Sequence, residues 1–326
     1  MRAAPIMVLW LLCLALALVS LAMGPSGFSP DIVTQGLAGE ATAKLILYEL
    51  RLPRALLGLM VGGTLGLAGA TLQGLFRNPL AEPGIIGVSG CAALGAVVAF
   101  YSGMAASVPL GLPLGGVIGA LLAIALLLAL AARDDRVSTL LLAGVALSAL
   151  AGAATALALN LSPNPYATVE VVFWLLGSLS DRSMQHVLLA LPFMIVGAGL
   201  MLACGRGLEA LTLGEDTASS LGISIRRLRS VAVIGAALAV GSGVAVTGAI
   251  GFVGLIVPHL LRPLVGHRPA PLMWISIPGG AALTLAADIA VRLIGGAVEL
   301  RLGVATALIG APFFLWLVLR LSRRAA

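Results

Sequence analysis

Residues 205–230 read GRGLEALTLGEDTASSLGISIRRLRS, and they form the only long polar stretch in a chain that is otherwise almost continuously apolar. Uncharged runs at residues 183–205 and 230–261 enclose this stretch, and about 20 apolar residues suffice to cross the hydrocarbon of a bilayer. The 205–230 loop is therefore expected to lie outside a membrane. A chain with so little polar surface cannot turn over a nucleotide or trap a dilute solute by itself, so we expect this loop to bind a soluble partner.

The composition indicates a polytopic membrane protein. Hydrophobic residues make up 60% of the sequence and charged residues 10%, with a mean hydropathy of +1.12, whereas globular proteins carry about 25% charged residues. The uncharged runs lie at residues 3–30, 55–76, 83–132, 137–169, 183–205, 230–261, 269–287 and 302–319. Two runs are too long for one crossing, and their Gly and Pro residues predict breaks near Ser102 to Pro113 and near Thr247 to Gly254. The expected fold is all-α, with ten transmembrane helices in one domain over residues 1–326.

The distribution of Lys and Arg predicts the orientation of these spans. Ten spans place both termini on one side, and if that side is the cytoplasm, cytoplasmic segments hold thirteen of the 19 basic residues. The thirteen are Arg2, Arg77, Arg133, Arg136, Arg206, Arg226, Arg227, Arg229, Arg262, Arg268, Arg320, Arg323 and Arg324. The other six are Lys44, Arg51, Arg54, Arg182, Arg292 and Arg301. Both termini and the 205–230 loop are thus predicted to be cytoplasmic, and the net charge of +6 reflects this asymmetry, with no indication of nucleic-acid binding.

The first apolar run is predicted to be a retained span and not a signal peptide. Its core from Ile6 to Met23 is longer than the roughly 7–15 residues of a secretory apolar region. Cys13, Cys91 and Cys204 lie in or beside apolar runs, so we interpret them as small buried hydrophobic residues and expect neither a disulfide nor a metal site.

Two segments look like counterparts in the two halves of the chain, residues 1–180 and 181–326 approximately. The first is GLAGATLQGLFRNPLAEPGIIGVSG at Gly66 to Gly90, and the second is GSGVAVTGAIGFVGLIVPHLLRPLVG at Gly241 to Gly266. Transporters built from inverted repeats carry such paired interruptions beside their pathway. We therefore expect two inverted-repeat-like halves, with functional breaks at Asn78-Pro79 and Pro258-His259. For most of the 41 glycines we expect only close helix packing, which is also the alternative interpretation of these two breaks.

Six strings carry a resemblance to a known family. They are RLPR at 51–54, LQGLFRNPLAEPGIIGVSG at 72–90, WLLGSL at 174–179, LTLGEDTASSLGI at 211–223, GAIGFVGLIVPHLLR at 248–262 and ELRLGVATALIGAPFFLW at 299–316. In order and spacing they resemble the FecCD family, the permease subunits of ATP-binding-cassette importers for iron siderophores, haem and cobalamin. The resemblance implies a homodimer in a bacterial inner membrane with a path along its two-fold axis. It also implies two cytoplasmic ATPase subunits, a periplasmic substrate-binding protein and contact with membrane lipid.

The resemblance places ATPase coupling in the 205–230 loop. Glu215 and Asp216 after Thr212 or Gly214 predict a helix start, because acidic groups complement the N-terminal end of a helix dipole. Leu221-Gly222 predicts the end of that helix. The coupling residues expected are Leu213, Gly214, Glu215, Asp216, Leu221 and Gly222. The alternative is a solvated loop whose charges only fix topology.

The resemblance also implies that Arg51, Arg54 and Arg292 are docking partners for glutamates of the binding protein. Arginine suits bidentate pairing with carboxylates, and these residues lie on the face that the positive-inside preference disfavours. The alternatives are anchoring of a helix end by snorkelling and, for Arg292, an intrahelical pair with Asp288 four residues earlier. Relatives have proline after Glu299-Leu300 where this chain has Arg301, which questions the role of Glu299.

For the cytoplasmic gate, the resemblance implies Asn78 and Leu80 at the first break and Ser138 and Thr139 at the start of the fifth span, Val137 to Leu161. This span is rich in Ala, Gly and Ser and is expected to line the path without tight binding groups. The alternative is ordinary packing of small residues.

The sequence offers no enzyme reading. It has no GxxxxGK[ST] string, and His186, His259 and His267 are scattered, so we expect no catalytic residue, no metal and no cofactor bound by this chain, with ATP used by partner subunits. The competing class is a secondary transporter driven by an ion gradient, which needs ionisable residues inside the membrane. Asp288 is the one acidic candidate near a span interior. The motifs do not distinguish between haem, ferric siderophore and corrinoid as cargo.

Overall fold

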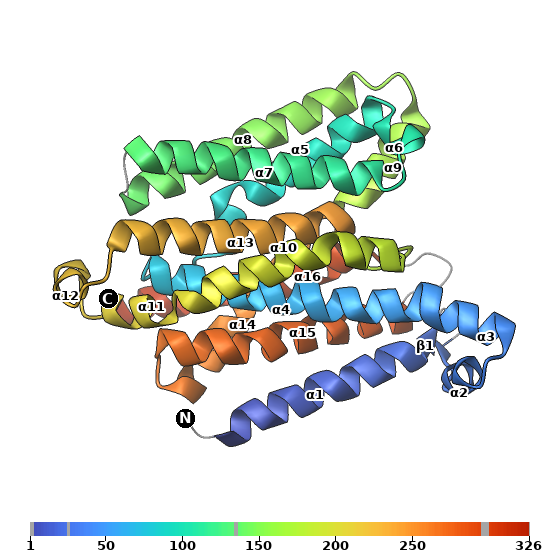
Figure 1. Cartoon of the computed structure of the whole chain (residues 1–326), viewed down its shortest axis with the longest axis horizontal. Helices are drawn as coiled ribbons and strands as arrows, with labels where there is room; N and C mark the ends of the chain where they lie inside the picture. The colour runs from blue at the N-terminus through green and yellow to red at the C-terminus, as the bar shows by residue number, and fades with distance from the viewer. Residues whose placement is uncertain (1–2, 25–26, 134–135, 295–299, 326) are drawn as a thin grey trace.

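The computed structural model describes residues 3–24, 27–133, 136–294 and 300–325, and the helices run side by side along the long axis of a bundle (Figure 1). α11 (Gly205–Leu211) and α12 (Glu215–Ser220) lie at one end, where α1 begins and α16 ends. α2 (Asp31–Leu37) and α3 (Ala41–Leu45) lie at the opposite end. We name these the α12 end and the α2 end. The termini and the 205–230 loop thus share one end, as the sequence predicts.

Long helices form the bundle and short elements connect them. The long helices are α1 (Ala3–Ala22), α4 (Leu52–Leu75), α7 (Gly111–Arg133), α8 (Val137–Asn160), α10 (Met184–Ala203), α13 (Ile225–Thr247), α15 (Pro269–Ile294) and α16 (Leu302–Ala325). The shorter ones are α5 (Val88–Tyr101), α6 (Met104–Ser107), α9 (Pro165–Leu175) and α14 (Val253–Leu261). A hairpin of β1 (Met23–Gly24) and β2 (Gly27–Phe28), a π-helical turn η1 (Ile46–Arg51) and the 3₁₀ turns η2 (Pro83–Ile86) and η3 (Arg262–Val265) complete the chain.

Within the described residues, seven helical segments are long and apolar enough to cross a membrane. Three shorter apolar helices accompany them, at Val88–Tyr101, Val253–Val265 and Leu302–Leu317. Both predicted breaks in the long apolar runs are confirmed, because α5 and α7 are separate helices, as are α13 and α14.

Two of the uncharged runs extend beyond the helices expected in them, which are α1 for the core Ile6 to Met23 and α8 for the fifth span, Val137 to Leu161. The run at 3–30 does not stay helical, since α1 ends at Ala22 and the β-hairpin follows. The run at 137–169 contains α8 and the beginning of a second helix, α9. Asn164 starts α9 by accepting a hydrogen bond from the Tyr166 backbone N–H at 3.0 Å, and Pro165 suits the first helical position because its missing N–H has no partner there.

Close backbone contact between α4 and α15 forms the centre of the bundle. A Cβ at Gly66 would lie 2.1 Å from the Ser276 carbonyl oxygen, and one at Gly280 would lie 2.1 Å from the Gly62 carbonyl oxygen. Only glycine fits at such distances, and small residues are what let membrane helices approach one another. α5, α7 and α8 form the upper layer in Figure 1, on the far side of α13 from α4. The interpretation of many glycines as packing residues is therefore confirmed.

Candidate functional site

The first broken segment lies between α4 and α5. α4 ends at Leu75, and the chain has no α-helix again until Val88. The Asn78 side-chain Oδ1 accepts a hydrogen bond from the Leu80 backbone N–H at 2.9 Å, which fixes a turn at the Asn78-Pro79 break. Arg77 just before it adopts a left-handed backbone, with φ 49°. The first predicted break is confirmed, and both predicted gate residues of this segment lie in it.

The second broken segment lies between α13 and α14, before the position expected from the sequence. The chain leaves helix at Gly248, with φ 73°, and resumes it after Phe252, with φ 66°. Pro258 and His259 lie inside α14. The prediction of a break at Pro258-His259 is therefore wrong, and the break is at residues 248–252.

The helix tolerates Pro258 because a side chain from another helix replaces the lost hydrogen bond. Proline has no N–H to donate to the carbonyl four residues earlier, which is that of Gly254. Gln73 Nε2 in the last turn of α4 lies 3.4 Å from the carbonyl oxygens of Gly254 and Leu255 and donates to both. The Gln73 side chain is 1% exposed, and its Oε1 accepts a hydrogen bond from Arg262 Nη2.

The two broken segments meet each other. Glu82 in the first segment accepts a hydrogen bond from the Phe252 backbone N–H at 2.6 Å through its Oε1. A Cβ at Gly69 of α4 would lie 1.8 Å from the Gly254 carbonyl oxygen, so α4 and α14 touch through their backbones. Sequence reasoning paired these segments but missed Gln73 and Glu82. The signal for both was present, because each is a polar residue inside the first glycine-rich segment, Gly66 to Gly90.

The 205–230 loop folds into two short helices, as expected. Gly214 has φ 103° and precedes α12, whose first turn holds Glu215 and Asp216. Gly222 follows α12 with φ 81°, a conformation that other residues adopt only with strain. The exposed fractions of Leu213 and Leu221 are 64% and 63%, so both ends of α12 present an apolar side chain to the outside. The predicted start and end of the helix are confirmed, and the coupling role of these six residues stays a prediction.

Glu215 connects α12 to two other elements. Its Oε1 accepts a hydrogen bond from Arg229 Nη2 of α13 at 2.7 Å and lies 3.7 Å from Arg77 Nη2. Arg77 directly precedes the Asn78-Pro79 turn. One carboxylate of the expected coupling surface therefore contacts the residue beside the expected gate, a connection that the sequence did not reveal.

The three arginines expected to dock a binding protein are turned inward at the α2 end. Arg51 is 7% exposed and donates to the carbonyl oxygens of Leu21 at 2.9 Å and Ser29 at 3.2 Å. Arg292, with a side chain 4% exposed, donates to the carbonyl oxygens of Ser20 at 3.1 Å and Met23 at 3.0 Å. Cations at the last carbonyls of a helix stabilise its C-terminus, and here that helix is α1.

Asp288 joins two of these arginines. The Asp288 carboxylate is 1% exposed and accepts bidentate hydrogen bonds from Arg54, at 3.1 Å from Nε and 2.8 Å from Nη2. It also pairs with Arg292, which confirms the intrahelical pair predicted from the four-residue spacing. The docking role of Arg51, Arg54 and Arg292 stays a prediction, and the contacts that the structure gives them are internal.

Arg182 and Arg301 are two further arginines at the α2 end, and both are partly buried. The Arg301 guanidinium lies 5.3 Å from the centroid of the Phe173 ring. Burial lowers the pKa of Arg182, Asp181 opposes this shift, and Arg301 adds to it. Glu299, whose role the sequence put in question, lies outside the described residues.

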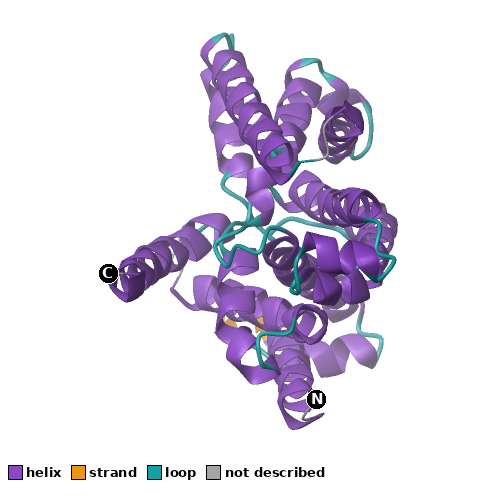
Figure 2. Cartoon of the chain, turned by 90° about the vertical axis from the view of Figure 1, so that its left-hand side faces the viewer, coloured by secondary structure: helices purple, strands orange, loops and turns teal. Residues whose placement is uncertain are grey.

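The second pair of expected gate residues, Ser138 and Thr139, occupies the first turn of α8 at the α12 end. α8 packs on the first broken segment, because a Cβ at Gly144 would lie 2.2 Å from the Ile85 carbonyl oxygen. The opposite side of α8 is open, with Leu142 70% and Leu150 67% exposed. Figure 2 shows the helix that ends at C, α16, standing away from the rest of the bundle. The chain thus presents two long apolar helices with uncovered faces.

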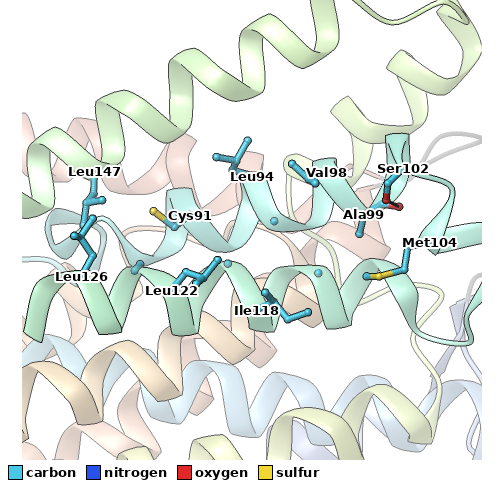
Figure 3. A pocket seen from close by; sticks show the side chains of 14 residues that line it. Cys91, Leu94, Val98, Ala99, Ser102, Met104, Ile118, Leu122, Leu126 and Leu147 are labelled. Carbon is cyan, nitrogen blue, oxygen red and sulfur yellow. Dashed lines mark hydrogen bonds between the residues drawn. The ribbon is translucent and has the colours of Figure 1, made fainter. Parts of the chain in front are cut away.

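An apolar cavity of about 400 Å³ lies between α5 and α7, with Leu147 of α8 at one side (Figure 3). Figure 3 shows Leu94 and Val98 of α5 and Ile118 and Leu122 of α7 around it. No charged side chain lines it. An apolar lining of this kind does not indicate a particular ligand.

Helices of membrane-spanning length, two broken segments joined inside the bundle and a polar helical loop at one end define a membrane transport protein. The sequence profile of the FecCD transport family matches residues 11–320. The chain belongs to this family.

Relatives match along most of their length. The vitamin B12 import system permease protein BtuC of Vibrio cholerae is 42% identical over 285 residues, 87% of this chain and 85% of the relative. The Fe(3+) dicitrate transport system permease protein FecD of Escherichia coli is 41% identical over 277 residues, 85% of this chain and 86% of the relative. A solved structure described as an inward-facing conformation of a metal-chelate type ABC transporter has a TM-score of 0.87 and 32% identity, covering 98% of this chain and 100% of that one.

Proposed function

We propose that this chain is the permease subunit of an ATP-binding-cassette importer that moves an iron chelate or cobalamin from a periplasmic binding protein to the cytoplasm. The observation that carries the proposal is similarity over at least 85% of the chain to permeases named for vitamin B12 and for ferric dicitrate. The chain itself binds no cofactor in this proposal, and separate subunits hydrolyse the ATP.

The permease has ten membrane segments in a single domain over residues 1–326. The seven long helical segments and the three shorter apolar ones support this number. The two contacting breaks, one in each half, support an inverted repeat, because paired interruptions beside a central site are what such repeats produce.

The α12 end faces the cytoplasm, and both termini lie there. The excess of Lys and Arg at this end supports the orientation in a bacterial inner membrane. The ATPase subunits bind the 205–230 loop, with the exposed Leu213 and Leu221 flanking α12 as apolar contacts. The α2 end receives the binding protein, with Arg51, Arg54 and Arg292 as the docking residues. Arg51 and Arg292 also donate to carbonyl oxygens at the C-terminus of α1, and Arg54 pairs with Asp288.

Two copies form a homodimer with the path between them. The uncovered faces of α8 and α16 support this arrangement, since a two-fold axis buries the same surface of both subunits. Asn78, Leu80, Ser138 and Thr139 then form the gate at the cytoplasmic mouth. The ion-driven carrier is disfavoured, because Asp288 is held between two arginines and is not available to carry a coupling ion.

The test is reconstitution of the chain with its copurifying ATPase subunits in proteoliposomes. Uptake of ferric siderophore, haem or cobalamin from the loaded binding protein should require ATP and should persist when ionophores remove all ion gradients. Uptake that needs an ion gradient but no ATP would contradict the proposal and support the secondary transporter.

A further inference from the structure

A second groove, of about 470 Å³, opens at the α12 end between α10, α11 and the start of α13. Its lining changes character along the helices. Arg206 follows the last turn of α10, and Arg227 lies in the first turn of α13. Val231 lines it one turn further along α13, about 6 Å from Arg227, and Leu200 lines it from the last turn of α10. The groove is therefore basic at the mouth and apolar inside.

The two arginines are available to a ligand. Both are exposed, and no carboxylate among the described residues pairs with either guanidinium. Nearby arginines of the same end differ, since Arg229 pairs with Glu215 and Arg268 with Glu209 at 2.8 Å. Among the residues that the structure describes, no carboxylate compensates the charge at the mouth of the groove.

The apolar side of the groove continues into the outer face of α10. The outer face of α10 is apolar and uncovered, with Leu188 61%, Ile195 62% and Val196 53% exposed. This face continues into the groove through Leu200 and Ala203. A soluble subunit can reach the arginines, but the apolar continuation along α10 lies at the depth of lipid chains.

We propose that this groove binds one anionic phospholipid of the leaflet at the α12 end. The phosphodiester lies between Arg206 and Arg227, because guanidinium groups pair with phosphate through two parallel hydrogen bonds. One acyl chain lies against Leu200, Ala203 and Val231. Basic pockets between helix ends are the sites where membrane proteins bind acidic headgroups. Gly222 also lines the groove, so the lipid contacts the loop that holds α12.

The experiment uses native mass spectrometry of the complex of this chain with its copurifying soluble subunits, extracted from bilayers that contain phosphatidylglycerol and phosphatidylcholine. The Arg206→Gln, Arg227→Gln double variant should retain phosphatidylglycerol roughly thirtyfold less, the combined effect of two interfacial cations. Ala203→Trp keeps both arginines and fills the apolar part, and it should lower retention as well. Arg133→Gln, which removes one exposed charge at the same end of α7, is the control and should behave as the unmodified chain.

Equal phosphatidylglycerol retention in the double variant and the control would overturn the proposal. The proposal would also be wrong if soluble glycerophosphoglycerol or inorganic phosphate displaced the lipid at equal concentration, because the site would then bind a free anion. If the isolated chain retained phosphatidylglycerol but the complex did not, the groove would be a binding site for a soluble subunit and the proposal would be wrong. Retention that depends on both arginines and on Ala203 within the complex supports the lipid site.

Discussion

Asp288 pairs with Arg292, which is buried, and with Arg54, whose side chain is 15% exposed. Asp288→Asn removes the carboxylate charge while keeping the shape, so both arginines lose the anion that they share. Breaking a buried pair from one side costs about 3–5 kcal/mol, and we expect a loss of unfolding free energy in that range. Thermal unfolding of the protein in detergent measures it.

The matched control is Glu209→Gln, which breaks an exposed pair. Arg268 and Glu209 have side chains 64% and 32% exposed, and such pairs contribute about 1 kcal/mol or less. If both variants unfolded at the same temperature, the Asp288 network would not stabilise the α2 end.

Local spacing explains which of these contacts the sequence could predict. Asp288 and Arg292 are four residues apart on one helix, so their pairing follows from helix geometry alone. Arg54 reaches Asp288 from 234 residues away, and Arg51 reaches Ser29 across the β-hairpin. These partners depend on how α1, α4 and α15 pack. For that reason the sequence could not show that these arginines make internal contacts.

The junction of the two broken segments depends on Glu82. Glu82→Ala leaves the Phe252 N–H without its acceptor, and an unsatisfied buried donor costs about 1–3 kcal/mol. Residues 248–252 should then exchange their amide hydrogens faster, and transport should fall. Glu82→Gln retains an acceptor oxygen and should keep slow exchange, so hydrogen exchange by mass spectrometry separates the two variants. Identical exchange in both would mean that this hydrogen bond does not hold the segments together.

Helix ends were predictable where a local signal was sufficient. Gly214, the acidic pair after it and Gly222 define α12 without help from the rest of the chain. Pro258 gave the opposite result, because proline normally ends a helix, and only Gln73 of a distant helix compensates for it here. The sequence therefore predicted a functional break at Pro258-His259, where the helix continues, in addition to the break near Thr247 to Gly254 that the structure has.

Across the molecule, Glu215 is placed to transmit movement from α12 to the first broken segment. Glu215→Gln weakens its contacts with Arg229 and Arg77, so α12 should move without displacing the Asn78-Pro79 turn. We expect severalfold more ATP hydrolysed per molecule of cargo, with assembly of the complex unchanged. Glu209→Gln is again the matched control, since Glu209 lies in α11 of the same loop and, among the described residues, pairs with Arg268 and not with Arg77 or Arg229. The ratio of ATP hydrolysis to uptake in proteoliposomes measures coupling, and a normal ratio in Glu215→Gln would contradict the role.

The open faces of α8 and α16 lead to the final prediction, which concerns the dimer. A two-fold axis along the path places residues near it beside their own copies, so the start of α8 in one subunit should approach the start of α8 in the other. Ser138→Cys or Thr139→Cys, in a background with Cys13, Cys91 and Cys204 replaced, should therefore cross-link between subunits. The yield should change when ATP binds the partner subunits, because the gate closes or opens there. Leu11→Cys on α1, 58% exposed and far from α8 in Figure 1, is the control and should not respond to ATP. If the protein were a monomer after gentle extraction, or if the cross-linking yield did not depend on nucleotide, neither the dimer nor the gate would be supported. Both proposals depend on the uncovered helix α8.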